Sequence, residues 1–212
     1  AILRTTGGGS NWSRQTSGTK QRLLGTAFSD AEHCTAVGLN GTMLRSTDGG
    51  RQWEAIPAPY LCDMLAVSHA GGGGKRKGFA VGTAGAMFLT EDGGLTWTSP
   101  PLATRQYLNG VSFADRNTGT AVGSWGAIVR TTDGGDVWTS QNSGTSNWIV
   151  GVCFTAPDTG TAVGEKGTIL RSTDGGTQWT MQSSGVATWL YNVCSTHANT
   201  RTIVGQDGVI LR

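Results

Sequence analysis

The chain has 212 residues, with 34 glycines, 5 prolines, 14% charged residues and a net charge of +2. The low charge excludes the concentrated basic face that nucleic-acid-binding proteins carry, so we expect no nucleic-acid partner. No apolar run approaches the roughly 18 residues that span a bilayer, and the first residues, AILR, do not resemble a signal peptide. We therefore expect a chain that does not itself cross a membrane.

One phrase recurs along the chain and sets the order of the predicted elements. Its copies are RTTGGGSNW at 4–12, RSTDGGRQW at 45–53, LTEDGGLTW at 89–97, RTTDGGDVW at 130–138 and RSTDGGTQW at 171–179. Their tryptophans, Trp12, Trp53, Trp97, Trp138 and Trp179, are 41, 44, 41 and 41 residues apart. Only the second unit therefore carries an insertion, and its Gly-Lys-Arg loop after residue 70 is predicted to be solvated and mobile.

Each unit alternates apolar and polar residues between glycine turns, which predicts four short strands and no helix. In the third unit the strands are predicted at about 107–113, 119–123, 126–131 and 137–141. A four-stranded unit of about 41 residues has the size of one β-propeller blade, which buries both faces only against its neighbours. We predict an all-β fold in which residues 1–212 form a single propeller domain.

The two ends of the sequence bear on the number of blades. Arg212 follows Arg171 by one repeat of 41 residues, so GVILR at 208–212 occupies a third-strand position. The same position is occupied by AILR at 1–4, which GVILR matches. We predict five four-stranded blades of about 41 residues, in a ring that closes when the first outer strand, next to Trp12, completes the last blade. The alternative is that the chain forms part of a larger six- or seven-bladed propeller.

The motifs TAVG, FAVG, G-x-I-L-R and S/T-T-D-G-G-x-x-W, with the linkers QTSGT at 15–19 and QNSGT at 141–145, resemble the photosystem II stability/assembly factor family. The resemblance covers essentially the whole chain. It implies a non-enzymatic, seven-bladed protein in the thylakoid lumen or another exported compartment, with a photosystem subunit as its protein partner. Its arginine-rich patch does not carry over, because the candidate cations here are scattered.

The acidic residues of the repeat are predicted to be structural. A carboxylate before Gly-Gly accepts backbone N–H bonds in a tight turn, and a tryptophan at one position per blade packs between sheets. This Asp-box assignment covers Asp48, Trp53, Asp92, Trp97, Asp133, Trp138, Asp174 and Trp179. The repeat thereby accounts for most of the side chains that could suggest chemistry.

Asp-boxes also occur in sialidases and glycanases, which require a close carboxylate pair or a tyrosine nucleophile beside arginines. The chain offers three tyrosines and, near the predicted upper face, Glu165 and Asp207. These residues form no recognisable catalytic set. We therefore predict no enzyme activity, no catalytic residue and no cofactor.

Histidine and cysteine spacing gives no metal site. The four cysteines lack a C-x-x-C pair, and we expect them to be small buried side chains. His33, His69 and His197 fall in or near loops of the opposite face, where solvated loop histidines are expected. We predict no bound metal.

Positions that depart from the repeat are the candidates for a binding site. Three tryptophans, Trp125, Trp148 and Trp189, lie outside the Asp-boxes. In a propeller, the loop before the first strand of each blade and the loop after its second strand emerge on the same face, and the three tryptophans lie in such loops. The predicted partner-binding residues are Arg22, Arg105, Tyr107, Trp125, Trp148, Lys166 and Trp189. They predict a protein-binding scaffold that resembles a photosystem assembly factor or accessory subunit, because exposed aromatic residues with polar neighbours form interaction hot spots. The alternative for Trp148 and Trp189 is that their rings fill the channel or cover loop backbone.

The rival hypothesis is a propeller lectin that binds glycans. Such a lectin repeats one polar set in every blade, whereas the equivalent hairpins read Leu-Asn, Thr-Ala, Ser-Trp, Glu-Lys and Gln-Asp. This variety favours one asymmetric protein partner over several equal sugar sites. A glycoside hydrolase is the more remote alternative.

Overall fold

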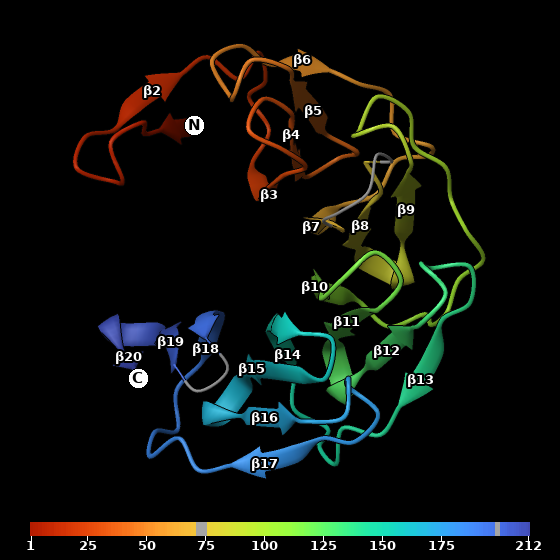
Figure 1. Cartoon of the computed structure of the whole chain (residues 1–212), viewed down its shortest axis with the longest axis vertical. Coiled ribbons are helices and arrows are strands. Elements are labelled where there is room, and N and C mark those ends of the chain that lie inside the picture. The colour runs from red at the N-terminus through yellow and green to blue at the C-terminus, as the bar shows by residue number, and fades with distance from the viewer. Residues whose placement is uncertain (71–75, 198–199) are drawn as a thin grey trace.

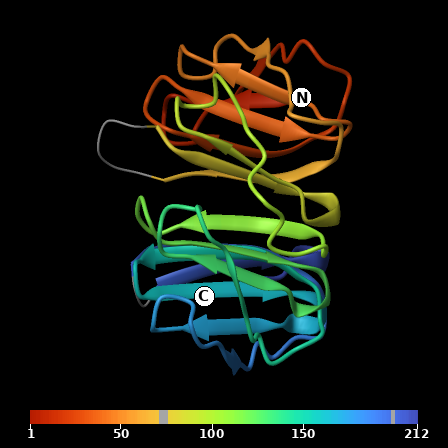
Figure 2. The ribbon, with the colours of Figure 1, turned by 90° about the vertical axis from the view of Figure 1, so that its right-hand side faces the viewer.

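A computed structural model shows six antiparallel sheets that follow one another around an open arc (Figure 1). It describes residues 1–70, 76–197 and 200–212, with the backbone alone at 196 and 197. The sheets stack face to face along the arc (Figure 2). The predicted mobile Gly-Lys-Arg loop falls largely on residues 71–75, which lie outside the described residues.

Each full sheet runs from a first strand at the inside of the arc to a fourth at its rim (Figure 1). The first strands are β3 (Leu23–Phe28), β7 (Met64–His69), β10 (Leu108–Phe113), β14 (Ile149–Ala156) and β18 (Leu190–His197). The second strands are β4 (Cys34–Gly38), β8 (Gly78–Gly82), β11 (Gly119–Gly123), β15 (Thr159–Gly164) and β19 (Thr200–Gly205). The third strands are β1 (Ile2–Arg4), β5 (Met43–Ser46), β9 (Met87–Thr90), β12 (Ile128–Thr131), β16 (Ile169–Ser172) and β20 (Ile210–Leu211).

The fourth strands are short and lie at the rim of the arc. They are β2 (Ser13–Gln15), β6 (Glu54–Ala55), β13 (Thr139–Gln141) and β17 (Thr180–Gln182). Four three-residue 3₁₀ turns link second to third strands, namely η1 (Thr83–Gly85), η2 (Ser124–Gly126), η3 (Glu165–Gly167) and η4 (Gln206–Gly208). Within the described ranges no helix is long and apolar enough to cross a membrane.

Three sheets have the four strands that the sequence predicts, and three do not. The sheet β7–β9 adds only an isolated bridge between Leu89 and Thr98, the sheet β18–β20 has three strands, and β1 pairs with β2 alone. The predicted transfer of 13–15 to the last sheet is not seen, because β2 is bonded to β1 in a local hairpin. Local pairing costs less loop-closure entropy than pairing with the distant end. The number of blades stays a prediction.

Three of the second strands are completely enclosed by their neighbours. Every residue of β4, β8 and β11 is buried, which suits their small TAVG and FAVG sequences. Each pair of neighbouring sheets from β3–β6 to β18–β20 encloses an apolar cluster, for example Val122, Ile128, Ile149, Ala162 and Leu170 between β10–β13 and β14–β17. Stability therefore comes from nearest-neighbour stacking, as in other repeat folds.

The Asp-box carboxylates hold the turn between third and fourth strands. In the last copy, Asp174 Oδ1 accepts the Thr177 and Gln178 N–H groups at 3.1 and 2.9 Å and the Ser172 hydroxyl at 2.9 Å. Trp179 Nε1 then donates to the Gly176 carbonyl at 3.0 Å. Equivalent carboxylate bonds recur at Asp48, Asp92 and Asp133.

Trp12 departs from the predicted packing between sheets, and Trp138 differs from the other Asp-box tryptophans in its hydrogen bonding. Trp12 is 59% exposed, because the sheet β1–β2 has no strand inside β1 to cover it. Trp138 is partly buried, and its Nε1 has no hydrogen-bond partner within the described chain, unlike the indoles of Trp53, Trp97 and Trp179. Phe79 and Phe113 both pack edge-on against the Trp138 ring. Trp138 is thus held in place by aromatic contacts with two neighbouring residues.

Arginines of three third strands, β1, β5 and β12, tie their sheets to the next one. Arg4 Nε donates to the Gly49 carbonyl at 2.6 Å, Arg45 Nε donates to Gly93 at 3.3 Å, and Arg130 Nε donates to Gly175. In each case the acceptor belongs to the Asp-box of the following sheet. These three arginines therefore link neighbouring sheets in addition to forming part of their own strands.

We expect the stability of the fold to fall in acid. Backbone N–H bonds, led by those of Gln52, Val137 and Gln178, hold the pKa values of Asp48, Asp133 and Asp174 below their ordinary value. A lowered folded-state pKa gives stability that is present above the unfolded pKa of about 3.9 and is lost as pH falls through the folded value.

Urea denaturation at a series of pH values would test this. The free energy of unfolding should be flat above about pH 5 and should decline below about pH 4. The variant Asp174→Asn should be less stable than wild type at neutral pH, and the difference should shrink as pH falls. A constant difference down to pH 2 would show that ionisation of Asp174 does not stabilise the turn.

Candidate functional site

Four aromatic side chains form a continuous row across three neighbouring sheets. Tyr107, Trp148 and Trp189 immediately precede β10, β14 and β18, and Tyr191 follows in β18. Ring centroids are 6.3 Å apart for Tyr107 and Trp148, and 6.5 Å apart both for Trp148 and Trp189 and for Trp189 and Tyr191. We call these four residues the aromatic row, and the end of the sheets where they lie the loop face.

The turns after the second strands hold the row in place. The Tyr107, Trp148 and Trp189 carbonyls accept N–H bonds from Ser124, Glu165 and Gln206 at 3.0, 2.8 and 2.8 Å. Two of the aromatic residues also donate backward to these turns. Tyr107 N–H bonds the Ser124 hydroxyl at 3.1 Å, and Trp148 N–H bonds Glu165 Oε2 at 3.2 Å.

Glycines at the end of the second strands make this close approach possible. A Cβ atom on Gly123, Gly164 or Gly205 would lie 1.7, 1.9 or 2.5 Å from the carbonyl oxygen of the adjoining aromatic residue. Those distances are far inside van der Waals contact, so no other residue fits without movement of the backbone. The last glycine of the TAVG motif is therefore a positioning residue for the row.

Trp125 lies on the same face but outside the row. It occupies the tip of η2, is 66% exposed, and has φ 56° and ψ 34°. The equivalent tips in the other sheets are Asn40, Ala84, Lys166 and Asp207, each with φ between 54° and 57°. A bulky side chain in this left-handed region costs roughly 1–2 kcal/mol relative to glycine or asparagine.

We expect Trp125→Asn to raise the free energy of unfolding by about 0.5–1 kcal/mol, because asparagine tolerates the left-handed conformation better than tryptophan. The opposite change at the equivalent tip, Asn40→Trp, serves as the matched variant and should lower stability. Urea denaturation of both proteins gives the comparison. If Trp125→Asn is destabilising, the indole makes stabilising contacts that outweigh the backbone strain.

The predicted cations are not gathered around the aromatic row as a group. Arg105 is exposed two residues before Tyr107, and the backbone there packs against Gly85 of η1. Lys166 is exposed at the tip of η3, and its Nζ lies 3.5 Å from Glu165 Oε1. Arg22 precedes β3, which the sheet β7–β9 separates from β10 (Figure 1), so the prediction that Arg22 joins this site is not supported.

Sequence reasoning missed Tyr191, although the signal was present. Residues two apart in a strand point to the same side, so Tyr191 follows Trp189 and stacks on it with an interplanar angle of 18°. It is 52% exposed. Asp63, which takes the place of Tyr107 before β7, was also missed, and its Oδ1 accepts the Asn40 N–H at 2.8 Å.

Two of the three histidines on the opposite face have described side chains, and both contact neighbouring residues. His33 Nδ1 lies 2.9 Å from Asp30 Oδ1, and the Arg76 guanidinium bonds the same carboxylate at 2.7 Å. His69 is enclosed rather than solvated, which corrects the loop prediction, and burial lowers its pKa to about 4. The side chain of His197 lies outside the described residues. No group of metal ligands occurs in the described part of the chain.

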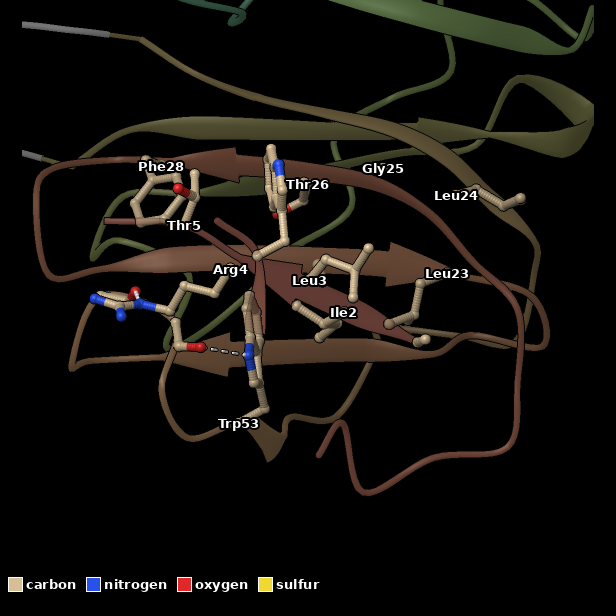
Figure 3. Close-up of a pocket in the computed structure, with 15 residues that line it drawn as sticks. Ile2, Leu3, Arg4, Thr5, Leu23, Leu24, Gly25, Thr26, Phe28 and Trp53 are labelled. Atoms are coloured by element: carbon tan, nitrogen blue, oxygen red, sulfur yellow. Dashed lines mark hydrogen bonds between the residues drawn. The ribbon is translucent and has the colours of Figure 1, made fainter. Parts of the chain in front are cut away.

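An apolar cavity of about 450 Å³ lies between β1 and β3 (Figure 3). Its walls include Leu3, Leu24, Phe28 and Trp53, and Phe28 is 55% exposed. In the described part of the chain β1 has no strand on its inner side, whereas in the stack of β7–β9 on β10–β13 the second strand β8 covers this space and its Phe79 stacks on Phe113. The cavity is thus a gap in the stacking of two sheets, and its one charged side chain, Arg4, is bonded to Gly49.

The four cysteines form no disulfide in this structure. Burial raises the pKa values of the Cys34 and Cys62 thiols to about 11, which disfavours reactive thiolates. Cys194 is exposed, unlike the buried position that the sequence suggested.

Comparison with known protein families identifies the family that the repeat motifs resemble. The sequence profile of the family described as photosynthesis system II assembly factor YCF48 matches residues 3–103 and 61–145. These ranges together cover well over half of the chain. The chain belongs to this family. No curated protein matches it.

Solved structures of the YCF48 family share the fold. YCF48 bound to D1 peptide has 20% sequence identity and a TM-score of 0.52, over 92% of this chain and 93% of that chain. YCF48 from Cyanidioschyzon merolae has 22% identity and a TM-score of 0.58, over 98% and 86% of the two chains. An ancestral GH74 enzyme has 15% identity and a TM-score of 0.68, over 93% of this chain and 32% of that one. At these identities the likeness establishes the propeller fold alone.

Proposed function

We propose that this YCF48-family chain is a non-enzymatic binding protein that engages a protein subunit of photosystem II during assembly. The observation that carries the proposal is the aromatic row, which presents four adjoining rings on one face and which the repeat does not require. Aromatic residues that are partly exposed and held rigidly are the usual anchors of protein interfaces. The D1 peptide bound by one YCF48 structure supports a photosystem protein as the partner.

The chemistry of the loop face supports binding over catalysis. Both oxygens of Glu165 are occupied, Oε2 by the Trp148 N–H and Oε1 near Lys166 Nζ. The Asp-box carboxylates are likewise committed to their turns. A five-bladed ring belongs to the same proposal and rests on the five copies of the Asp-box phrase.

Affinity capture from detergent-solubilised photosynthetic membranes tests the site. Replacing Trp125, Trp148 and Trp189 with alanine should reduce recovery of photosystem II subunits at least tenfold, because each central aromatic anchor contributes about 1–2 kcal/mol or more. Mass spectrometry identifies and quantifies the recovered subunits. The reason for the expected loss is removal of apolar contact area, since these substitutions change no charge.

A matched control replaces three exposed apolar residues away from the loop face, namely Leu95, Val137 and Met181. This variant should recover photosystem II subunits as well as wild type. Equal recovery by both triple variants would reject the aromatic row as the binding site. Binding of both wild type and the control to a glycan array, in place of photosystem II subunits, would favour the lectin hypothesis.

A further inference from the structure

We infer that the aromatic row binds an extended polypeptide segment with apolar side chains at alternate positions, an acidic residue at one end and a basic residue at the other. This inference rests on the proposed function, because it specifies the ligand of the same site. Two independent features of the loop face carry it. One is the spacing of the aromatic rings and the other is the placement of unpaired charges.

The spacing of the rings matches an extended chain. Centroids repeat every 6.3–6.5 Å from Tyr107 through Trp148 to Trp189. Alternate side chains lie on one side of a β-strand and repeat every 6.4–6.8 Å or so. The contact stripe of an α-helix advances about 5.4 Å per turn and falls out of step by about 1 Å at each ring. An extended segment can therefore place one apolar side chain beside each ring.

The charges of the loop face give the row two different ends. Arg105 lies beside the Tyr107 end, and Asp207 lies at the tip of η4, whose Gln206 N–H bonds the Trp189 carbonyl. Both residues are exposed, and neither forms an ion pair with another described side chain. In the middle, Lys166 is neutralised by Glu165 at 3.5 Å. Complementary charges in the ligand therefore belong at its ends and not at its centre.

The geometry also sets the length of the ligand core. Two steps of 6.3 and 6.5 Å between three rings correspond to about four residues of extended chain at roughly 3.3 Å each. Three apolar residues at alternate positions thus span the rings of Tyr107, Trp148 and Trp189, and a charged residue follows on each side, toward Arg105 and toward Asp207. Rigid rings held by backbone bonds lose little entropy on binding, which favours such a short segment.

Fluorescence anisotropy with labelled synthetic peptides tests the spacing. The probe carries three phenylalanines at alternate positions with serines between them, one glutamate on one side, one lysine on the other, and three further serines outside the charged residues, so that the comparison peptide can widen its phenylalanine spacing and keep its charges at the ends of the phenylalanine core. We expect it to bind the full chain at least tenfold more tightly than a peptide of the same composition whose phenylalanines repeat every three to four residues. Equal or tighter binding of the helix-spaced peptide would overturn the inference.

Charge variants of the chain test the two ends. Arg105→Ala should weaken the glutamate-bearing probe about threefold to tenfold and leave a probe with serine in place of glutamate unchanged. Asp207→Ala should do the same for the lysine end, and Arg22→Ala, on a distant sheet, should have no effect. Loss of affinity that is independent of the peptide charges would contradict the assignment of the ends.

The outcome separates this inference from the proposed function. If the variant lacking Trp125, Trp148 and Trp189 loses photosystem II subunits but wild type does not prefer the alternately spaced probe, the proposed function stands and the inference is wrong. If that variant captures the subunits normally, the proposed function is wrong, whatever the probes do.

Discussion

Replacing Gly164 with alanine is expected to lower the free energy of unfolding by about 3 kcal/mol and to displace the aromatic row. The new Cβ would lie 1.9 Å from the Trp148 carbonyl oxygen and 2.9 Å from the Ile149 Cα, so the backbone of the neighbouring strand must move. That movement breaks the bond from the Glu165 N–H to the Trp148 carbonyl, which is 2.8 Å long. Urea denaturation measures the loss of stability, and capture of photosystem II subunits measures the effect on the row.

Gly144→Ala provides the matched control. Gly144 has φ 71° and nothing within 4 Å of the position of a Cβ, so alanine there costs only the left-handed backbone conformation, about 1 kcal/mol. Gly164 has an extended backbone, with φ −173°, so its cost arises from the close approach alone. Similar losses for the two variants would mean that the carbonyl contact at Gly164 is easily relieved.

The second large effect is expected at Phe79, where the repeat elsewhere uses threonine. Phe79 is fully buried, stacks on Phe113 at 4.8 Å with an interplanar angle of 8°, and meets the edge of Trp138 at 5.5 Å. Phe79→Thr should lower the free energy of unfolding by about 3–5 kcal/mol, because it leaves a cavity between two sheets. Denaturation in urea should show a lower midpoint with an unchanged slope.

A volume-conserving variant distinguishes a cavity from a change of local structure. Phe79→Leu keeps most of the apolar volume and should cost about 1.5 kcal/mol or less. Threonine at this position would restore the repeat consensus of Thr35, Thr120 and Thr161. If Phe79→Thr is as stable as wild type, the stack adapts to either residue and the aromatic cluster contributes little.

Much of the fold could be predicted because the repeat encodes it locally. The Asp-box turn depends on residues within one short segment, and the strands of the third unit were placed within two residues at each end. The relation between the first and last sheets could not be predicted in this way. Residues 1–4 and 208–212 have nearly the same sequence, so a sequence pattern cannot distinguish which of them pairs with 13–15. In the structure β2 pairs with β1.

Part of the candidate site could also be predicted from the repeat. Equivalent repeat positions placed Tyr107, Trp148 and Trp189 on neighbouring sheets, and the structure brings these three rings into contact. Repeat position gives a face but not a distance around the arc. It therefore assigned Arg22 to the same site, although a further sheet lies between β3 and β10. The left-handed backbone conformation of Trp125 could not be predicted either, because the residue types at this repeat position vary and include alanine as well as asparagine.

Site-specific photo-cross-linking tests the central claim most directly, because it reports where the partner lies. A photoreactive amino acid in place of Lys166, at the tip beside the aromatic row, should cross-link to a photosystem II subunit in solubilised photosynthetic membranes. The same amino acid in place of Thr177, in an exposed Asp-box turn, should not. Cross-linking of a photosystem II subunit from position 177, with none from position 166, would contradict the assignment of the loop face as the binding surface.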